Sequence, residues 1–142
     1  MKNLFVPYEL ALQLKGKGFK ENCLGFYSSS ANAGDNNFSQ HWFARALDQD
    51  KHNPDWVEFS DLTNDKSCLA PLYQQAIDWF DSKNILIFIS PYESGIDGGS
   101  EITFNWDIMH KETMEQLATD HSTYDTRTQA LTVAIKEALT LI

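Results

Sequence analysis

The clearest pattern of apolar and polar positions lies in the middle of the chain. Apolar residues recur there at helical spacing, at Leu69, Leu72, Ala76, Trp79 and Phe80. A stripe this broad predicts an amphipathic helix that begins near residues 69–71 and covers a sheet. Asn84 is suited to the left-handed conformation that ends a helix.

Two runs after this helix predict a β-hairpin. Residues 85–89 are all apolar, which is typical of a strand covered on both faces. Pro91 is expected to limit further pairing of that strand. Residues 102–108 alternate between apolar and polar, which predicts a half-buried strand with its aromatic face inward. The glycine-rich stretch 93–100 is interpreted as the hairpin loop, because it lacks the lysine and the helix start of a phosphate-binding loop.

The first half of the chain carries weaker patterns. Residues 6–17 predict a helix with Pro7 in its first turn and Gly18 at its end. Residues 23–28 predict a strand. Residues 38–47 fit either a strand or a helix; we favour the strand, because aromatic residues after a turn favour a hairpin. Residues 56–59 are a candidate for a further short strand.

The last third of the chain predicts two helices. Residues 110–118 fit a short helix with Met114 and Leu117 on its apolar side. Ser122 and Asp125 then resemble a capping box. Apolar residues at helical spacing continue from there to Ile142, which predicts a C-terminal helix.

These elements predict an α+β fold in the order α-β-(β)-(β)-α-β-β-α, with the two weaker strands in parentheses. Because the order lacks long crossovers between adjacent strands, we expect a mainly antiparallel sheet of about three to five strands with helices packed on one face. The length of 142 residues fits a single domain over residues 1–142.

Three stretches of the chain are similar, in combination, to one protein family. They are residues 9–27, residues 70–80 with their Gln74-Gln75 and Asp78-Trp79-Phe80 pattern, and residues 124–142. The set resembles small uncharacterised proteins of phage and prophage regions in Bacteroides-type gut bacteria. The resemblance covers about half of the chain and implies a shared fold and a mobile-element origin. Residues 29–64 resemble an enlarged insertion, and the family has no assigned activity, so the resemblance implies no functional residue.

The charge of the chain narrows the classes of partner. Eleven basic and 20 acidic residues give a net charge of −9. Phosphate backbones repel such a surface, so direct nucleic-acid binding is not expected. An acidic inhibitor of a nucleic-acid-handling or defence protein is an alternative, although the acidic residues are scattered and Lys51 and Lys66 lie among them.

The sequence also bears on the compartment. No basic leader with a following apolar segment precedes Leu4, so no secretory signal is expected. The longest apolar run, residues 85–89, is far shorter than the roughly 20 residues that cross a bilayer. Two cysteines are too few for a disulfide scaffold. We therefore expect a cytoplasmic protein with free thiols, no membrane contact and no cofactor.

One group of residues is of the types that bind metal ions. His110 and His121 lie close in sequence to Asp107 and Asp120. Histidine and carboxylate side chains are ligands of zinc and other divalent ions. Their spacing matches no compact ligand motif, so these residues are weak metal candidates and we expect an ordinary polar surface.

A second group could supply a nucleophile. Cys23 and Cys68, with His41, are the ingredients of a thiolate–imidazole pair. Cys68 precedes the central helix, whose dipole could lower the pKa of a thiol. We expect buried cysteines instead, because no oxyanion loop accompanies either one.

Exposed aromatic and polar residues are candidates for binding. The candidate binding residues are Tyr27, Trp42, Trp56, Tyr92, Gln74, Gln75 and Asp78. Aromatic residues line many binding grooves, and the polar residues lie on the solvent side of the central helix. We expect a non-catalytic binding or accessory protein of phage or mobile-element origin that contacts another protein. A small enzyme with a Cys/His or His/carboxylate site and a self-assembling homo-oligomer are alternatives.

Overall fold

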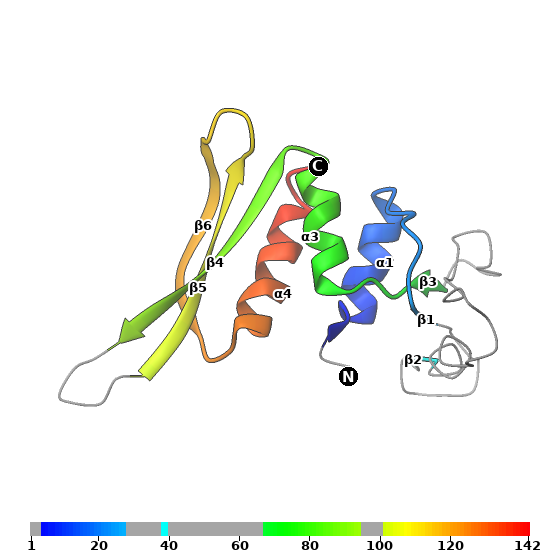
Figure 1. Ribbon diagram of the computed structural model, residues 1–142, viewed down its shortest axis with the longest axis horizontal. Helices are drawn as coiled ribbons and strands as arrows, with labels where there is room; N and C mark the ends of the chain where they lie inside the picture. The colour runs from blue at the N-terminus through cyan, green and yellow to red at the C-terminus, as the bar shows by residue number, and fades with distance from the viewer. Residues whose placement is uncertain (1–3, 28–37, 40–66, 95–100) are drawn as a thin grey trace, which may run out of the picture. The chain divides into compact units, whose positions relative to one another are not determined.

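The computed structural model describes residues 4–27, 38–39, 67–94 and 101–142. The chain forms two compact units, residues 1–75 and residues 76–142. Each unit combines helix with antiparallel sheet, so the predicted α+β class is confirmed. The element order also agrees broadly with the prediction, although the strands form two separate sheets (Figure 1).

The first unit begins with helix α1 (Tyr8–Gly16). Pro7 precedes it as the N-cap residue. Gly18 has φ +94°, a left-handed conformation that favours glycine, and the Phe19 N–H donates to the Leu14 carbonyl at 2.9 Å. The predicted helix end at Gly18 is therefore confirmed.

Three short strands form the sheet of the first unit. Its order is β2 (Phe38–Ser39), β1 (Phe26–Tyr27) and β3 (Cys68–Leu69), and both pairings are antiparallel. The expected strand pairing of residues 38–39 with the 23–28 segment is confirmed, while β1 is shorter than predicted. Residues 40–47 and 56–59 lie outside the described residues, as do residues 29–37 and 40–64 of the expected insertion.

The start of the central helix was predicted wrongly. Cys68 and Leu69 pair with Tyr27 and Phe26 in β3, and helix α3 (Tyr73–Asp81) begins only after Pro71. The Gln75 side chain accepts a hydrogen bond from the Leu72 N–H at 3.0 Å and so satisfies a free donor near the helix start. At the other end, Asn84 has φ 63°, as its predicted capping role requires.

The second unit contains a three-stranded antiparallel sheet in the order β4-β5-β6. Its strands are β4 (Ile85–Ser94), β5 (Glu101–His110) and β6 (Gln116–Tyr124). β4 and β5 pair without a register shift from Ile85↔His110 to Ser94↔Glu101, which confirms the predicted hairpin. β6 carries two register shifts against β5.

Helix α4 (Arg127–Ala138) lies along one face of this sheet (Figure 1). Buried side chains on the covered face include Ile85, Trp106 and Ile108. The helix buries Ala130, Leu131, Ala134, Ile135 and Ala138. The predicted C-terminal helix and the inward aromatic face of β5 are therefore confirmed. The capping box lies four residues after Ser122, between Thr126 and Gln129, rather than between Ser122 and Asp125.

The backbone direction along β4 explains why the strand continues past Pro91. The Lys111 N–H donates to the Asn84 carbonyl at 2.8 Å, just before the first residue of β4. Hydrogen-bonded and non-hydrogen-bonded pairs alternate along an antiparallel ladder, so the even-numbered residues of β4 direct their N–H and C=O groups toward β5. Odd-numbered residues, among them Pro91, direct these groups away from β5. Pro91 therefore costs no bond with β5, and the expectation that it limits pairing is wrong.

The predicted helix over residues 110–118 is also wrong. Residues 111–113 form a turn, Met114 has φ 55°, and the chain enters β6 at Gln116. The His110 N–H donates to the Glu115 carbonyl at 2.8 Å across this turn. A left-handed residue at 114 cannot continue an α-helix, so pairing with β5 determines the structure here.

Candidate functional site

The predicted metal candidates do not converge. Asp107 pairs with Thr119 and Trp106 with Asp120, so Asp107 and Asp120 lie on opposite faces of the sheet. Asp107 accepts a hydrogen bond from the Gln116 side chain at 2.9 Å, while the His110 ring accepts one from the Thr113 N–H at 3.4 Å. Among the described residues, no group of three or more His, Cys, Asp and Glu side chains could hold a metal ion.

Asp120 instead forms a small polar cluster with Tyr124. The Tyr124 hydroxyl donates to Asp120 at 2.6 Å, and the Ser122 N–H donates to the same carboxylate at 2.8 Å. Both bonds lower the pKa of Asp120, the first more strongly. The bond to Asp120 raises the pKa of Tyr124, while the indole of Trp106 acts on the same hydroxyl in the opposite direction. The cluster holds Tyr124 in place beside α4.

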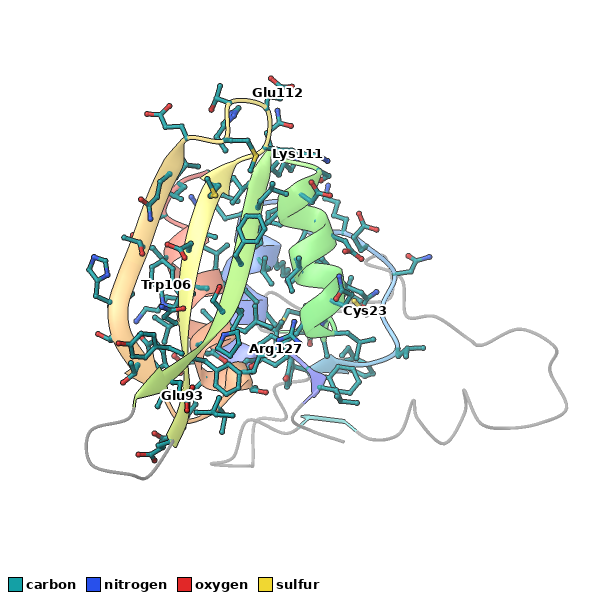
Figure 2. All side chains as sticks on the ribbon, turned by 60° about the vertical axis from the view of Figure 1, so that its left-hand side comes forward. Cys23, Glu93, Trp106, Lys111, Glu112 and Arg127 are labelled. Atoms are coloured by element: carbon teal, nitrogen blue, oxygen red, sulfur yellow. The ribbon has the colours of Figure 1, made fainter. Side chains whose placement is uncertain are left out.

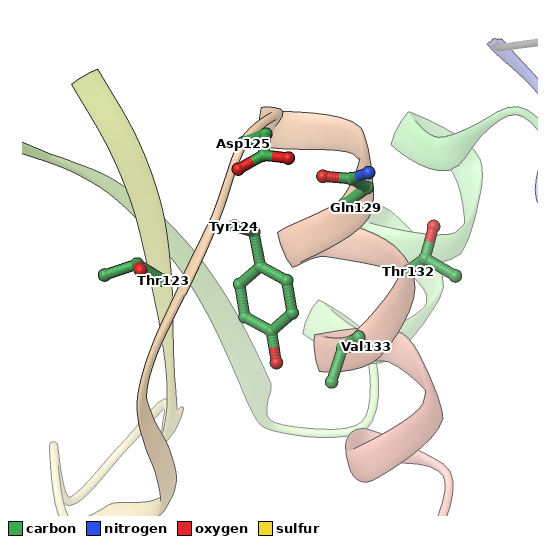
Figure 3. A pocket seen from close by; sticks show the side chains of 6 residues that line it. All are labelled: Thr123, Tyr124, Asp125, Gln129, Thr132 and Val133. Carbon is green, nitrogen blue, oxygen red and sulfur yellow. The ribbon is translucent and has the colours of Figure 1, made fainter. Parts of the chain in front are cut away.

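A pocket with a volume of about 460 Å³ lies beside this cluster. It is lined by Thr123, Tyr124, Asp125, Gln129, Thr132 and Val133. Figure 3 shows the Tyr124 ring between β6 and α4. The polar groups of Gln129 and Thr132 already bond within the protein, to the backbone of residues 126 and 128. The pocket therefore offers a ligand few unengaged polar groups, and its lining contains no basic residue.

The two cysteines are buried, as expected. Burial raises the pKa of both Cys23 and Cys68 to about 12, with nearby Glu21 adding to the effect at Cys23. Lys15 acts in the opposite direction on Cys68, but its ammonium group donates to the Ser67 carbonyl at 2.8 Å. Thiols with such pKa values carry almost no thiolate at neutral pH. His41 lies outside the described residues.

Two of the candidate binding residues, Tyr27 and Gln75, have structural roles in the first unit. Tyr27 is 7% exposed, and its hydroxyl donates to the Val6 carbonyl at 2.6 Å. It belongs to a core cluster with Phe5, Ala11, Cys68 and Ala70. Gln75 also donates to the Asn22 carbonyl at 2.9 Å. Gln74 and Asp78 are exposed, and Trp42 and Trp56 lie outside the described residues.

Tyr92, the remaining candidate, lies on the face of the β4–β6 sheet opposite α4. The cross-strand register places even-numbered residues of β4 and odd-numbered residues of β5 on this face. We call it the open face, because no helix of the described part of the second unit covers it. Its apolar members are Leu86, Phe88, Tyr92 and Met109.

The open face exposes large apolar side chains. Phe88 is 41% exposed and Tyr92 is 54% exposed, while Leu86 and Met109 are half-buried. The expectation that both faces of residues 85–89 are covered is therefore wrong. Asp107 and Gln116 bond to each other on the neighbouring part of this face. Figure 2 shows Glu93 near the end of β4, and Lys111 and Glu112 at the turn before β6.

Sequence reasoning identified Tyr92 but missed Phe88, Leu86 and Met109 as surface residues. It assigned the whole 85–89 run to the core because every residue in it is apolar. No local pattern in the sequence indicates that α4 covers one face of this sheet and that no helix among the described residues covers the other. None of the helices in the described ranges has the length and apolar character of a membrane-spanning segment. Comparison with protein-family models, curated proteins and solved structures finds no match to this chain.

Proposed function

We propose that the chain is a non-catalytic binding protein that acts through contact with another protein, and that the open face of the β4–β6 sheet is its contact surface. The observation that carries this proposal is the exposure of Phe88 and Tyr92 beside Leu86 and Met109. Large contiguous apolar patches on soluble proteins commonly mark binding sites. Aromatic residues and methionine are also enriched where proteins bind one another.

The chemistry of the other candidates supports a binding role over a catalytic one. Both cysteines are protonated at neutral pH because burial raises their pKa. The carboxylates of Asp107 and Asp120 each serve a partner within the sheet. An accessory role in a phage or mobile element is part of the proposal and rests on the sequence resemblance. A cytoplasmic location fits the two free thiols.

The test compares three forms of the full chain as bait in affinity capture from the native host, followed by mass spectrometry. The wild type is compared with the double variant Phe88→Ser/Tyr92→Ser and with Ile102→Ser. Ile102 is 62% exposed and lies on the other set of β5 positions, so it is a matched loss of an exposed apolar side chain away from the open face. Circular dichroism checks that all three forms are folded.

We expect at least one protein to be captured by the wild type and by Ile102→Ser and to be lost with the double variant. Recovery of the same proteins with all three forms would refute the open face as the contact surface. Recovery of no specific protein with the wild type would contradict the binding function itself.

A further inference from the structure

The outer edge of β4 carries backbone groups that no described strand pairs. β4 is at the edge of its sheet, with β5 as its neighbour. Its odd-numbered residues direct their N–H and C=O groups to this edge, as the Lys111–Asn84 bond establishes. The His110–Glu115 bond agrees, because it directs even-numbered residues of β5 toward β6. The edge positions are Ile85, Ile87, Ile89, Pro91 and Glu93.

The two edges of the sheet differ in how they discourage pairing. β6 has two register shifts and carries Asp120 and His121 along its length. Such shifts and charges are the usual means of blunting an edge strand. β4 has an unbroken register and no charged residue from Ile85 to Tyr92. Only Pro91 removes a donor from its edge, which leaves the donors of Ile85, Ile87 and Ile89.

The charges at the ends of this stretch are complementary under a twofold axis. Lys83 and Glu93 lie at equal distances in sequence before and after Phe88. Lys83 lies in the turn before β4, where its ammonium group is 5.6 Å from the centroid of the Trp79 ring. If two β4 strands pair antiparallel about an axis at Phe88, Glu93 of each copy lies near this turn of the other. The chain has a net charge of −9, so two copies repel each other over most of their surface. The edge of β4 from Ile85 to Tyr92 carries no charged residue, so this repulsion is weakest there.

The same register also matches the backbone and the side chains. Ile87 of one copy pairs with Ile89 of the other, and both direct their N–H and C=O groups across the junction. Phe88 lies opposite Phe88 of the second copy in a non-hydrogen-bonded pair, where side chains approach most closely. The exposed ring of Phe88 would then be partly buried against its counterpart.

We propose that the protein forms a twofold dimer through antiparallel pairing of its β4 strands, centred on Phe88. The two three-stranded sheets become one six-stranded sheet, and the two open faces become continuous. This dimer does not depend on the proposed binding of another protein, since its hydrogen bonds join edge backbone groups of β4; Phe88 is the one side chain that both proposals share. The partner for the edge is thus a second copy of this chain.

The first experiment measures molecular mass against concentration by sedimentation equilibrium. The wild type is expected to approach twice the 16.2-kDa chain mass as concentration rises. Ile89→Pro removes an edge donor, as Pro91 already does, and leaves the even-numbered bonds to β5 intact. We expect it to raise the dimer dissociation constant at least tenfold while circular dichroism retains the native strand signal. A wild type that stays monomeric, or a folded Ile89→Pro that dimerises as well as the wild type, would overturn the proposal.

The second experiment tests the register by cross-linking. Phe88→Cys places two thiols opposite each other, where Cβ atoms about 4.5–5.5 Å apart can relax into a disulfide. Leu86→Cys is the control on the same face, because its thiols lie about 13 Å apart in this register. With oxidised glutathione as oxidant, we expect a covalent dimer of Phe88→Cys and none of Leu86→Cys. Equal cross-linking of both variants, or cross-linking of Leu86→Cys alone, would refute pairing about Phe88.

The third experiment exchanges the terminal charges. Glu93→Lys is expected to weaken the dimer roughly tenfold, because the two attractive charge pairs between the copies become repulsive. The double variant Lys83→Glu/Glu93→Lys restores opposite charges and is expected to restore the wild-type dissociation constant. A double variant as weak as Glu93→Lys alone would refute the facing of Lys83 and Glu93.

Discussion

Removing an apolar side chain should lower the free energy of unfolding by very different amounts on the two faces of the β4–β6 sheet. Ile108 is fully buried beneath α4, and Phe88 is 41% exposed on the open face. Both residues lie in the same hairpin, so Ile108→Ala and Phe88→Ala lose a similar strand preference. The difference between the two variants therefore measures how well each face is covered.

The expected magnitudes follow from burial. Ile108→Ala removes three buried carbons, at about 0.8 kcal/mol each, and leaves a cavity, which together give a loss of about 3 kcal/mol in the free energy of unfolding. Phe88→Ala leaves no enclosed cavity and removes a ring that water already reaches, so its loss is about 1 kcal/mol. With an m-value of about 2 kcal/mol/M in urea, the midpoints should fall by about 1.5 M and 0.5 M.

The assay is urea unfolding followed by circular dichroism at one low protein concentration, so that association through β4 does not contribute. Equal m-values across the wild type and the two variants establish that the midpoints report stability. If Phe88→Ala lowers the midpoint as much as Ile108→Ala does, Phe88 is covered in the native protein. The open face, and the binding function proposed for it, would then be refuted.

Three further predictions follow from single contacts. Thr126→Ala removes the side chain that caps α4 and should cost about 1 kcal/mol in the free energy of unfolding, measured by urea titration. Tyr124→Phe removes the bond that lowers the pKa of Asp120, so its stability deficit should be present at neutral pH and should shrink as the pH falls below 3.8, the ordinary pKa of the carboxyl. Cys23 and Cys68 should resist a thiol reagent at neutral pH in the native protein and react after unfolding, as absorbance during labelling can show.

The capping prediction has a matched control, and each of the three predictions has an outcome that would contradict it. Thr128→Ala is the matched control for the cap, because Thr128 is exposed in the same helical turn; equal losses from the two threonine variants would contradict a capping role. A Tyr124→Phe deficit that stays constant from neutral to acidic pH would show that the bond to Asp120 does not contribute. Labelling of the native thiols as fast as that of the unfolded chain would contradict their burial.

Elements with strong local patterns were predicted well. The apolar stripe of α4 lies within one helix, and the alternation of residues 102–108 reports one covered face directly. Gly18 and Asn84 also mark helix ends by their own backbone preferences, since both have positive φ. These features depend on residues close in sequence, so the sequence alone carries the information.

Elements that depend on distant partners were predicted poorly. β6 contains Ala118 and Asp120, which are of types depleted in strands, and it is a strand because β5 pairs with it. β3 is similarly set by pairing of Cys68 and Leu69 with β1, far away in sequence. No local pattern distinguishes such segments from helix or loop. The candidate metal residues failed for the same reason, because the faces of Asp107 and Asp120 follow from the register of β5 and β6.

β4 carries an exposed aromatic residue, Phe88, that the fold of the second unit does not require. Odd-numbered residues such as Ile85 and Ile87 lie on the α4 side and account for burial on that face. On the open face, threonine would supply the same strand preference as Phe88 without exposing an aromatic ring to water. Exposed apolar residues at an edge strand also increase the risk of uncontrolled association. A specific contact made by Phe88 would offset this risk of uncontrolled association. The proposed partner surface and the proposed β4 dimer both place Phe88 in such a contact.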